Sequence, residues 1–481
     1  MAKITKQSEN FSKWYTDVIL EADLADYGPV KGTMVIKPYG YALWGNVKNV
    51  LNNMIEKSGH ENAYFPLFIP KSFLEKEAKH VEGFAKECAV VTHSKLVSED
   101  GSLTVDPSSK LEEEIIVRPT SETIIWHMFK KWITSYRDLP VKINQWANVV
   151  RWEMRTRLFL RTSEFLWQEG HTAHATKEEA IEETLMIVDI YKSLFEDYLA
   201  IPTLIGRKSN MERFAGADET YSIETMMRDK KALQAGTSHY LGTNFGTAFD
   251  VKFQSKENEE KPVFATSWGV STRMIGALIM VHGDDKGLKI PPKIAPTQIV
   301  IIPINPKNQS KEEFDSFIDT VHSELSNNNI RSFVDDSNNS PGFKFNNWEL
   351  KGVPMRLEVG LQEFKNQSVT VCRRDSGEKE EISTEKLSTL LSTLDNIQQN
   401  MYDSAKLFLE ENTFDINDYS AFKEKLSKEN CFIKAYWDGS EQSEVKVKDD
   451  TKATIRCILE DIDDTEARCI VSGEPAKHLV V

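Results

Sequence analysis

The chain has 481 residues, of which 40% are apolar and 28% charged, a composition typical of a folded protein long enough for several domains. Its 59 Lys and Arg against 74 Asp and Glu give a net charge of −15, which argues against a wholly basic nucleic-acid binder or a polybasic membrane protein. A polar N-terminus and the lack of an apolar run of bilayer length predict a soluble, cytoplasmic protein with no membrane partner.

Apolar and aromatic segments with helical periods alternate up to about residue 290, where three prolines in 290–296 predict a linker. Strand, helix and strand then follow, which is typical of a small α/β domain. Two further strands and a long polar helix that starts near Thr384 and fades around Asn400 complete it. The strands and the helix expected after the linker are 298–304, 310–325 (helix), 330–334, 354–359 and 368–372.

Charge is distributed unevenly along the chain. The last 81 residues hold 18 Asp and Glu against 11 Lys and Arg, so this segment is an unlikely platform for a polyanion. By contrast, 141–161 carries five basic residues and the single acid Glu153. The basic residues are Lys142, Arg151, Arg155, Arg157 and Arg161. We therefore expect a polyanion to bind near 141–161.

The most informative segment runs from Arg151 to His171. Two strands joined by a basic loop would project residues of alternate parity to one face. Arg151 and Glu153 would share a face, as would Arg161, Phe165, Trp167, Glu169 and His171. Guanidinium groups, carboxylates and aromatic rings on one platform suit a nucleoside triphosphate. An amphipathic hairpin with a solvated charged face is the alternative that spacing alone leaves open.

This segment resembles motif 2 of the class II aminoacyl-tRNA synthetases, an Arg-x-Glu followed across a loop by an aromatic residue. The segment 267–276, with Arg273 opening an apolar helix, resembles motif 3, and 59–66 resembles motif 1. The resemblance implies an α/β (α+β) fold, with an antiparallel-sheet catalytic domain, an α/β anticodon-binding domain and a small α+β C-terminal domain. It also implies a homodimer formed through motif 1. The domains expected are 1–290, 291–400 and 401–481.

Within that class the chain is similar to the prolyl-tRNA synthetases over 117–122, 164–171, 234–239 and 341–349. Only 93 residues separate His174 from Trp268, which leaves no room for an inserted editing domain. The resemblance is therefore to the archaeal and eukaryotic type. It implies attachment of L-proline to tRNA(Pro) in two steps through prolyl-adenylate, with ATP and Mg²⁺ and release of AMP and pyrophosphate.

The resemblance also implies roles for individual residues. Arg151 would bind the α-phosphate, Glu153 the adenine amino group and Phe165 the adenine ring. Arg161 and Arg273 would hold the distal phosphates. The catalytic residues would be Arg151 and Arg273. Further ATP contacts would come from Thr162, Gln234 and Ser271. The proline-binding residues would be Thr120, Glu122, Arg151, Trp167, Glu169, His171, Thr237 and His239, with Phe84 and Phe214 closing the ring pocket.

Physical chemistry favours those assignments independently. Proline carries a secondary ammonium group, a carboxylate and a compact apolar ring, so its pocket needs an anion such as Glu122, a cation such as Arg151, and aromatic walls. Without the resemblance, Phe84, Phe214 and Trp167 would more simply be core residues. His171 and His239 would then be structural histidines.

The small α/β domain resembles the anticodon-binding domain of several class II synthetases. Basic and aromatic side chains that could stack on or pair with unstacked bases are Lys344, Phe345, Trp348, Arg356, Arg373 and Arg374. A solvated face with a buried Trp348 is the alternative.

The C-terminal domain departs from the family, whose members usually carry four cysteines for one zinc ion. Alignment places Asp438, Ser443, Cys469 and Ser472 at the ligand positions, so we expect no structural zinc and no metal ligands. Cys431 and Cys457 are expected to be buried apolar residues, and the five cysteines are too scattered for a disulfide framework. The expected core is Ile455, Ile458, Leu459, Ile470 and Val471. A rearranged site of Cys457, Cys469 and His478 is the alternative.

Two other functions are alternatives to proline ligation. A sister synthetase for threonine would need a zinc-binding cysteine near the motifs, and none occurs there. A catalytically silent paralogue that only binds tRNA or a protein partner would be expected to have lost Arg151, Glu153 or Arg273, and all three are present.

Overall fold

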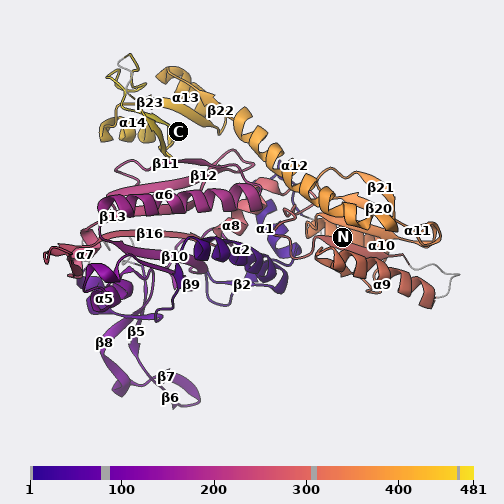
Figure 1. The fold of residues 1–481 in the computed structure, drawn as a ribbon, viewed down its shortest axis with the longest axis horizontal. Helices are drawn as coiled ribbons and strands as arrows, with labels where there is room; N and C mark the ends of the chain where they lie inside the picture. The colour runs from indigo at the N-terminus through magenta and orange to yellow at the C-terminus, as the bar shows by residue number, and fades with distance from the viewer. Residues whose placement is uncertain (1–3, 77–86, 305–310, 463–465) are drawn as a thin grey trace.

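The computed structural model describes residues 4–76, 87–304, 311–462 and 466–481. In Figure 1, a large β-sheet with covering helices forms one side of the molecule, a smaller α/β body forms the other, and the C-terminal residues lie above the sheet. The helix α12 (Leu390–Glu411) joins the smaller body to the C-terminal one. Within the described residues, no helix is both long and apolar enough to cross a membrane.

The large sheet has eleven strands in the order β22-β23-β25-β24-β11-β12-β13-β16-β10-β9-β3. Neighbouring strands are antiparallel except for β3 with β9 and β22 with β23, which are parallel. The strands before the linker are β3 (Glu61–Asn62), β9 (Val141–Val150), β10 (Glu164–His174), β11 (Leu204–Arg207), β12 (Glu219–Met226), β13 (Ala232–Gly242) and β16 (Phe264–Ser271). An antiparallel ladder sends alternate side chains to opposite faces, so one face can pack on helices while the other carries polar groups.

Helices cover one face of this sheet. α6 (Lys177–Ser193) begins at a capping box in which Thr176 and Glu179 accept from each other's backbone N–H groups, and it continues into the π-helical turn η3 (Leu194–Tyr198). Its Tyr191 packs against Trp268 of β16. A Cβ atom at Gly170 of β10 would collide with the Trp268 ring, so glycine lets this ring lie flat beneath the sheet.

α8 (Arg273–His282) follows β16 directly, and every residue from Met274 to His282 is buried. The apolar helix expected after Arg273 is therefore present and is buried on all sides, which fits its apolar sequence. α1 (Phe11–Glu21) and α2 (Pro38–Lys57) pack into the same cluster, and α1 is capped by the Asn10 side chain.

A three-stranded sheet and a hairpin project from the half of the molecule that contains the large sheet, as the lower part of Figure 1 shows. The order of the sheet is β4-β8-β5, and the hairpin is β6-β7. Their bounds are β4 (Phe68–Pro70), β5 (Ala89–His93), β6 (Leu96–Glu99), β7 (Ser102–Val105) and β8 (Lys110–Val117). The smaller elements of this half are β1 (Ala25–Tyr27), β2 (Met34–Ile36), α3 (Lys71–Lys76), η1 (Pro107–Ser109), α5 (Glu122–Trp132), η2 (Tyr136–Asp138), α7 (Asn244–Ala248), β14 (Lys252–Gln254) and β15 (Glu260–Pro262).

The α/β body after the linker contains a five-stranded sheet in the order β18-β17-β19-β20-β21. All four strands expected there are present within one or two residues. The bounds are β17 (Ile299–Pro303), α9 (Lys311–Asn327), β18 (Ser332–Val334), α10 (Pro341–Leu350), β19 (Met355–Val359), α11 (Leu361–Asn366), β20 (Ser368–Arg373), β21 (Lys379–Ser383) and η4 (Thr384–Thr389). Residue 310, the first of the expected helix, lies outside the described residues. The linker itself is packed: Ile290, Ile294 and Ala295 are buried.

The long polar helix differs from expectation at both ends. A 3₁₀ segment covers 384–389, and α12 then continues to Glu411, so the predicted end near Asn400 is wrong. The helix persists because an apolar stripe including Met401, Ala405 and Leu409 stays buried beyond residue 400. In the sequence, the polar residues between these positions obscure the helical period of the apolar residues.

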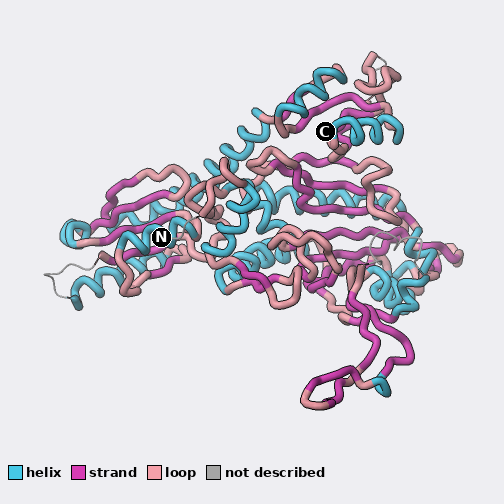
Figure 2. The backbone as a smooth tube through the Cα atoms, turned by 180° about the vertical axis from the view of Figure 1, so that it is seen from behind, coloured by secondary structure: helices cyan, strands magenta, loops and turns pink. Residues whose placement is uncertain are grey.

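The C-terminal strands extend the large sheet, as the reverse view in Figure 2 also shows. β24 pairs with β11 at Ile458 and Arg207, and a Cβ atom at Gly206 would collide with the Ile458 carbonyl group, so glycine permits this approach. Met226 packs with Cys457 and Phe432 across the same junction. The bounds here are β22 (Thr413–Asp415), α13 (Tyr419–Lys428), β23 (Phe432–Trp437), α14 (Glu441–Thr451), β24 (Ile458–Asp461) and β25 (His478–Val480).

Candidate functional site

The strand register assembles a cleft on the sheet face opposite α6. Glu169 of β10 lies opposite Gly269 of β16, which lies opposite Thr237 of β13. The next row is His171, Ser267 and His239. Strands distant in the chain thus place polar side chains in rows above one cavity of about 530 Å³.

Thirteen of the predicted site residues line this one cavity. They are Thr120, Glu122, Arg151, Phe165, Trp167, Glu169, His171, Phe214, Gln234, Thr237, His239, Ser271 and Arg273. Three others, Glu153, Arg161 and Thr162, lie in the loop between β9 and β10 but outside the cavity lining. Phe84 lies outside the described residues.

Arg151 lies one residue beyond the end of β9, so the expected strand through Glu153 is shorter than predicted. Its Nε donates to the Pro119 carbonyl oxygen at 3.0 Å, and its guanidinium lies over the Phe165 and Trp167 rings at 5.5 and 5.4 Å. Burial lowers the pKa of Arg151, and the Glu122 carboxylate opposes that shift. The side chain is therefore a desolvated cation aimed into the cavity, where an anionic ligand gains most.

Arg273 enters the cavity from the first residue of α8. Its Nε and Nη1 donate to the carbonyl oxygens of Leu160 and Gln234 at 3.2 and 3.3 Å. Burial lowers its pKa, and the charge of Arg161 lowers it further. Glu153 binds Arg161 at 2.7 Å in the motif 2 loop, and this pair is at the solvent edge. Three arginines thus converge from one loop and one helix.

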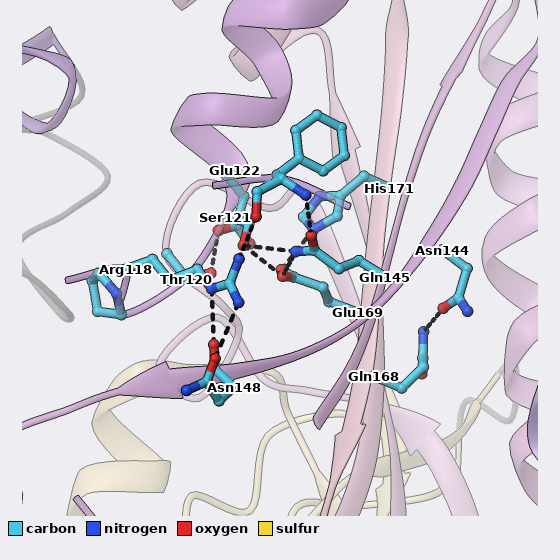
Figure 3. Close-up of polar contacts among 12 residues, drawn as sticks. Arg118, Thr120, Ser121, Glu122, Asn144, Gln145, Asn148, Gln168, Glu169 and His171 are labelled. Atoms are coloured by element: carbon cyan, nitrogen blue, oxygen red, sulfur yellow. Dashed lines mark hydrogen bonds and ion pairs between the residues drawn. The ribbon is translucent and has the colours of Figure 1, made fainter. Parts of the chain in front are cut away.

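A buried carboxylate network lies at the base of the cavity, and Figure 3 shows it. One Glu169 oxygen accepts from Ser121 Oγ at 2.5 Å and from Gln145 Nε2 at 2.7 Å, and the other pairs with His171 Nε2 at 3.0 Å. Although burial alone would raise it, these bonds hold the pKa of Glu169 below its usual value. Burial opposes but does not prevent a raised pKa of His171, because Glu169 stabilises its proton.

The pKa of His239 is shifted in the opposite direction to that of His171. Burial, with the neighbouring His171 charge, lowers the pKa of His239 to about 3. The neutral ring contacts Thr220 Oγ1 at 2.9 Å and lies 4.6 Å from the Phe214 ring, so it forms part of an apolar wall. The cavity therefore contains one histidine whose protonated form is favoured by a carboxylate and one whose neutral form is favoured by burial.

Thr120 and Glu122 lie where the chain enters α5. Glu122 is the first residue of that helix and is buried, and Thr120 Oγ1 donates to its carboxylate. A carboxylate at a helix N-terminus is stabilised by the helix dipole. Glu122 therefore supplies a fixed negative charge opposite the arginines.

Several residues around the cavity were missed in the sequence. Gln145 and Ser121 hold Glu169, and Gln145 lies directly opposite Glu169 in the β9–β10 register. Lys208, Glu212 and Arg213 also line the cavity. Gln145 is an even number of residues from Arg151, so strand alternation could have predicted that both side chains lie on the same face. Lys208 lies in a loop far from the motifs in the sequence, and no local pattern predicts that it faces the cavity.

Two of the six candidate anticodon-contacting residues are corrected by the structure. Lys344 is buried, with its Nζ donating to the Asp335 carbonyl oxygen at 2.7 Å. Arg374 is buried and makes two bonds to Asp284, at 2.9 and 2.6 Å. Both side chains hold structure together, because buried charges require paired partners. Phe345 lies under the Arg356 guanidinium at 4.4 Å and Trp348 bonds Asp335, while Arg373 binds Asp375.

Three of the four aligned zinc positions, Asp438, Ser443 and Ser472, form a hydrogen-bonded cluster with Ser440, which we call the Asp438 cluster. The fourth position, Cys469, is buried in an apolar cluster. One Asp438 oxygen accepts from Ser440 Oγ at 2.9 Å and Ser443 Oγ at 2.7 Å, and the other accepts from Ser472 Oγ at 2.7 Å. Although burial would raise it, these bonds lower the pKa of Asp438 to about 2. Hydroxyl groups are poor Zn²⁺ ligands, so this donor set does not fit the family's metal.

The remaining C-terminal expectations have mixed outcomes. Ile455 and Ile458 are buried beside Cys469, while Val471, Leu459 and Ile470 are only partly buried. Cys457 is buried, but Cys431 is only half-buried. The alternative zinc site is not assembled: Cys457 and Cys469 belong to different apolar clusters, and His478 binds Asp461 at 2.7 Å.

Comparison with known proteins adds independent findings. The model of the tRNA synthetase class II core domain (G, H, P, S and T) matches residues 104–282. The anticodon binding domain model matches 298–394, and that of the prolyl-tRNA synthetase C-terminal domain matches 419–481. These matches follow the order of the three bodies in the structure.

Relatives match over almost the whole length. The proline–tRNA ligase of Bacteroides fragilis is 53% identical over 99% of this chain and 98% of its own, and that of Flavobacterium johnsoniae is 52% identical with the same coverage. Prolyl-tRNA synthetase from Cryptosporidium parvum with halofuginone and AMPPNP superposes with a TM-score of 0.92 at 38% identity, covering 99% and 98% of the two chains. Its complex with L-proline and AMP gives 0.91 at 36%, covering 100% and 96%. The chain therefore belongs to the prolyl-tRNA synthetase family, the proline–tRNA ligases of class II.

Proposed function

We propose that the cleft activates L-proline with ATP and then transfers the prolyl group to the terminal ribose of tRNA(Pro). One observation carries this proposal: the sheet and the segments that follow β9 and β16 bring carboxylates, two half-buried arginines and aromatic walls to a single cavity. These are the groups that a compact zwitterion and a triphosphate require together.

In the proposed amino-acid pocket, Glu122 receives the secondary ammonium group of proline and Arg151 its carboxylate. Glu169, Thr120 and Thr237 complete the polar side. Trp167, His239 and Phe214 form the wall for the pyrrolidine ring, with the neutral His239 presenting an apolar face. Glu169 favours the protonated form of His171, which would add a second cation near the carboxylate. Its Nδ1 is buried without a protein partner among the described residues, so it can donate to a ligand.

In the proposed nucleotide pocket, Arg151 binds the α-phosphate and Arg161 and Arg273 the distal phosphates. Phe165 stacks on adenine, Glu153 accepts from its amino group, and Thr162, Gln234 and Ser271 add further contacts. Arg161 must exchange its bond to Glu153 for a phosphate oxygen. That exposed pair costs little to break, about 0–1 kcal/mol.

The first step needs positioning more than proton transfer. The proline carboxylate is ionised at neutral pH and attacks the α-phosphorus in line, so that its oxygen forms a bond to phosphorus while the bond to pyrophosphate breaks. Arg151 and Arg273 stabilise the charge that develops on the phosphoryl oxygens, at about 3 kcal/mol for each well-aimed donor. In the second step, the ribose hydroxyl displaces AMP from the prolyl carbonyl carbon.

Mg²⁺ would arrive with ATP. This ion takes most of its ligands from phosphate oxygens and water, with one or two carboxylates. Three carboxylates line the cavity, and Glu122 and Glu169 already have assigned partners, so Glu212 is the one that would contact the ion. The ion would offset phosphate charge during the first step.

Pyrophosphate exchange tests the proposal. Exchange of labelled pyrophosphate into ATP is measured with each of the twenty amino acids, and we expect L-proline to support the fastest exchange. Exchange that does not depend on proline would contradict the assignment. The silent-paralogue alternative predicts no exchange with any amino acid.

We propose the domains 1–290, 291–400 and 401–481 as catalytic, anticodon-binding and C-terminal, respectively, with tRNA(Pro) bound by the second. Support comes from the anticodon binding model over 298–394. Among the basic and aromatic candidates there, Phe345, Trp348, Arg356 and Arg373 are the ones that remain after the correction above. Because its substrate is tRNA, we place the protein in the cytoplasm.

We also propose the archaeal and eukaryotic type without an editing insertion. The segment between His174 and Trp268 is filled by α6, three strands of the large sheet and short elements that pack against it. A proline pocket can reject the smaller alanine by only about 1–3 kcal/mol, so some mischarging is expected. Rapid deacylation of preformed alanyl-tRNA by the purified enzyme would contradict this type.

A homodimer through motif 1 is the final part of the proposal. Tyr64 lies in motif 1 and is exposed, and Tyr41 of α2 and Tyr27 and Val35 of the β1–β2 hairpin are exposed earlier in the chain. Exposed large apolar side chains support a subunit interface. Light scattering should give twice the mass of the 54.9 kDa chain.

A further inference from the structure

The C-terminal domain reaches the nucleotide side of the cleft through one buried ion-pair cluster. Arg456, in the segment before β24, donates to one oxygen of Glu224 from Nε at 3.1 Å and from Nη2 at 2.8 Å. The other Glu224 oxygen binds Lys208 Nζ at 2.7 Å. Lys208 also donates to the Arg456 carbonyl oxygen at 2.6 Å, and both Glu224 and Lys208 are buried.

This cluster lies one strand away from Arg273. Glu224 of β12 is the cross-strand partner of Gln234 in β13, next to a register irregularity at Ile223 and Glu224. The Gln234 carbonyl oxygen accepts from Arg273 Nη1 at 3.3 Å. Gln234, Arg273 and Lys208 all line the cavity. Arg456 is therefore connected to the phosphate-binding arginine through two adjacent strands.

The charges of Glu224 and Arg456 both act on Arg273. The Glu224 carboxylate raises the pKa of Arg273 against the larger effect of burial, and the Arg456 cation lowers it. Without Arg456, one Glu224 oxygen would be buried without its bidentate partner. A buried carboxylate in that state recruits the nearest available cation. Arg273 is such a cation, and ATP phosphates would then compete with Glu224 for it.

We propose that Arg456 is a positioning residue for ATP, which holds the Glu224 carboxylate away from Arg273 and keeps that guanidinium available to the nucleotide. This inference deepens the proposed function and rests on the assignment of Arg273 to ATP. It assigns the C-terminal domain a part in adenylate formation, in addition to its docking on the large sheet.

The test is the Michaelis constant for each substrate in proline-dependent pyrophosphate exchange. We expect Arg456→Met to raise the KM for ATP about tenfold, the effect of one weakened charged contact, and to leave the KM for proline within about twofold. Arg456→Lys keeps the charge but loses the planar fork, so its KM for ATP should lie between those of wild type and Arg456→Met. This milder variant also serves if Arg456→Met does not fold.

The double variant Arg456→Met with Glu224→Gln separates positioning from docking. Neutralising the Glu224 side chain, which keeps only Lys208 as a partner in Arg456→Met, should return the KM for ATP to within about threefold of wild type, because no carboxylate then competes for Arg273. A purely structural role of Arg456 predicts no such rescue, since two domain-joining groups would be lost instead of one.

Arg207→Met is the matched control. Arg207 of β11 binds Asp461 of β24 at 2.6 Å across the same domain junction, but neither residue lines the cavity. We expect its KM for ATP to equal that of wild type. An equal rise in this control, an unchanged KM in Arg456→Met, or no rescue in the double variant would overturn the inference. If wild type itself showed no proline-dependent exchange, the proposed function would fail and this inference with it.

Discussion

The catalytic cleft and the Asp438 cluster both gather polar side chains from distant segments, but they differ in what they leave open. In the cleft, the buried Nδ1 of His171 and Nε1 of Trp167 have no partner among the described residues. In the Asp438 cluster, the three serine hydroxyl groups all donate to one carboxylate. The cleft is built to receive a ligand, whereas the cluster is closed on itself.

This difference explains why the two regions diverge from the family in different ways. Proline and ATP require particular charges, so the residues that meet them fit the family's motifs. The metal positions serve stability, which other chemistry can supply. In this chain an aspartate and serines form hydrogen bonds where four cysteines would hold a metal, and the apolar contacts of Ile455, Ile458 and Cys469 lie beside them.

Substitution of Arg151 should have the largest effect on the cleft. Arg151→Ala removes the cation assigned to both substrates and should lower proline-dependent exchange by about 10³-fold, while the protein stays folded. Arg151→Lys should also fail badly, because a point charge does not reproduce the planar fork. Exchange kinetics with circular dichroism as the folding control measure this. Exchange within about tenfold of wild type would contradict the role of Arg151.

Substitution of Asp438 should affect stability and not chemistry. Asp438→Ala removes the acceptor shared by the buried Ser443, the half-buried Ser440 and the exposed Ser472, at a cost of about 1–3 kcal/mol in the free energy of unfolding. Urea denaturation of the variant measures this, and exchange activity at low temperature should be unchanged. Asp449→Ala, at an exposed position on α14, is the control and should stay within about 0.5 kcal/mol of wild type.

The Glu169–His171 pair predicts a pH dependence of stability. The raised pKa of His171 means that its contribution is present below its ordinary value of 6.5 and is lost as pH rises through the folded-state value. The lowered pKa of Glu169 means that its contribution is lost only in acid, as pH falls below its ordinary value of 4.5. Glu169→Gln should therefore lower the melting temperature more at pH 6 than at pH 9. An equal difference at both values would show that the pair is not ionised.

Chelation should have no effect on either region. EDTA should leave the melting temperature of the ligand-free protein unchanged, and elemental analysis of protein purified without chelator should find no stoichiometric zinc, because serine hydroxyl groups do not replace thiolates. About one zinc ion per chain would mean that the Asp438 cluster is not the closed unit that its hydrogen bonds indicate.

The sequence predicted the elements of the cleft better than their connections. β10 and α8 were expected from period and motif, because local alternation of apolar and polar residues is visible in a short window. The strand expected at 151–153 is instead β9, which ends at Val150, and β16 was not expected as a strand. The hydrogen bonds of Gln145 and Ser121 to Glu169 were not expected, since they depend on the β9–β10 register and on the path into α5.

Long-range pairing was the hardest feature to predict. Nothing near Ile458 indicates that it pairs with Arg207, some 250 residues earlier, and so the joining of the C-terminal strands to the catalytic sheet was not foreseen. Gly206 was the only feature in the local sequence consistent with this pairing, since its missing side chain lets the Ile458 backbone approach β11. The full length of α12 was missed for a similar reason: its last turns are stabilised by tertiary contacts of Leu409 with Phe432 and Cys457.

The most direct test of the difference between the two regions is a calorimetric titration of L-proline into wild type, Glu122→Gln and Asp438→Asn. Both substitutions replace a carboxylate by an amide of the same size. The account predicts that Glu122→Gln weakens proline binding at least about tenfold, because the ammonium group loses its anionic partner, and that Asp438→Asn changes it less than about twofold. Wild-type affinity in Glu122→Gln would contradict the placement of proline in this cleft.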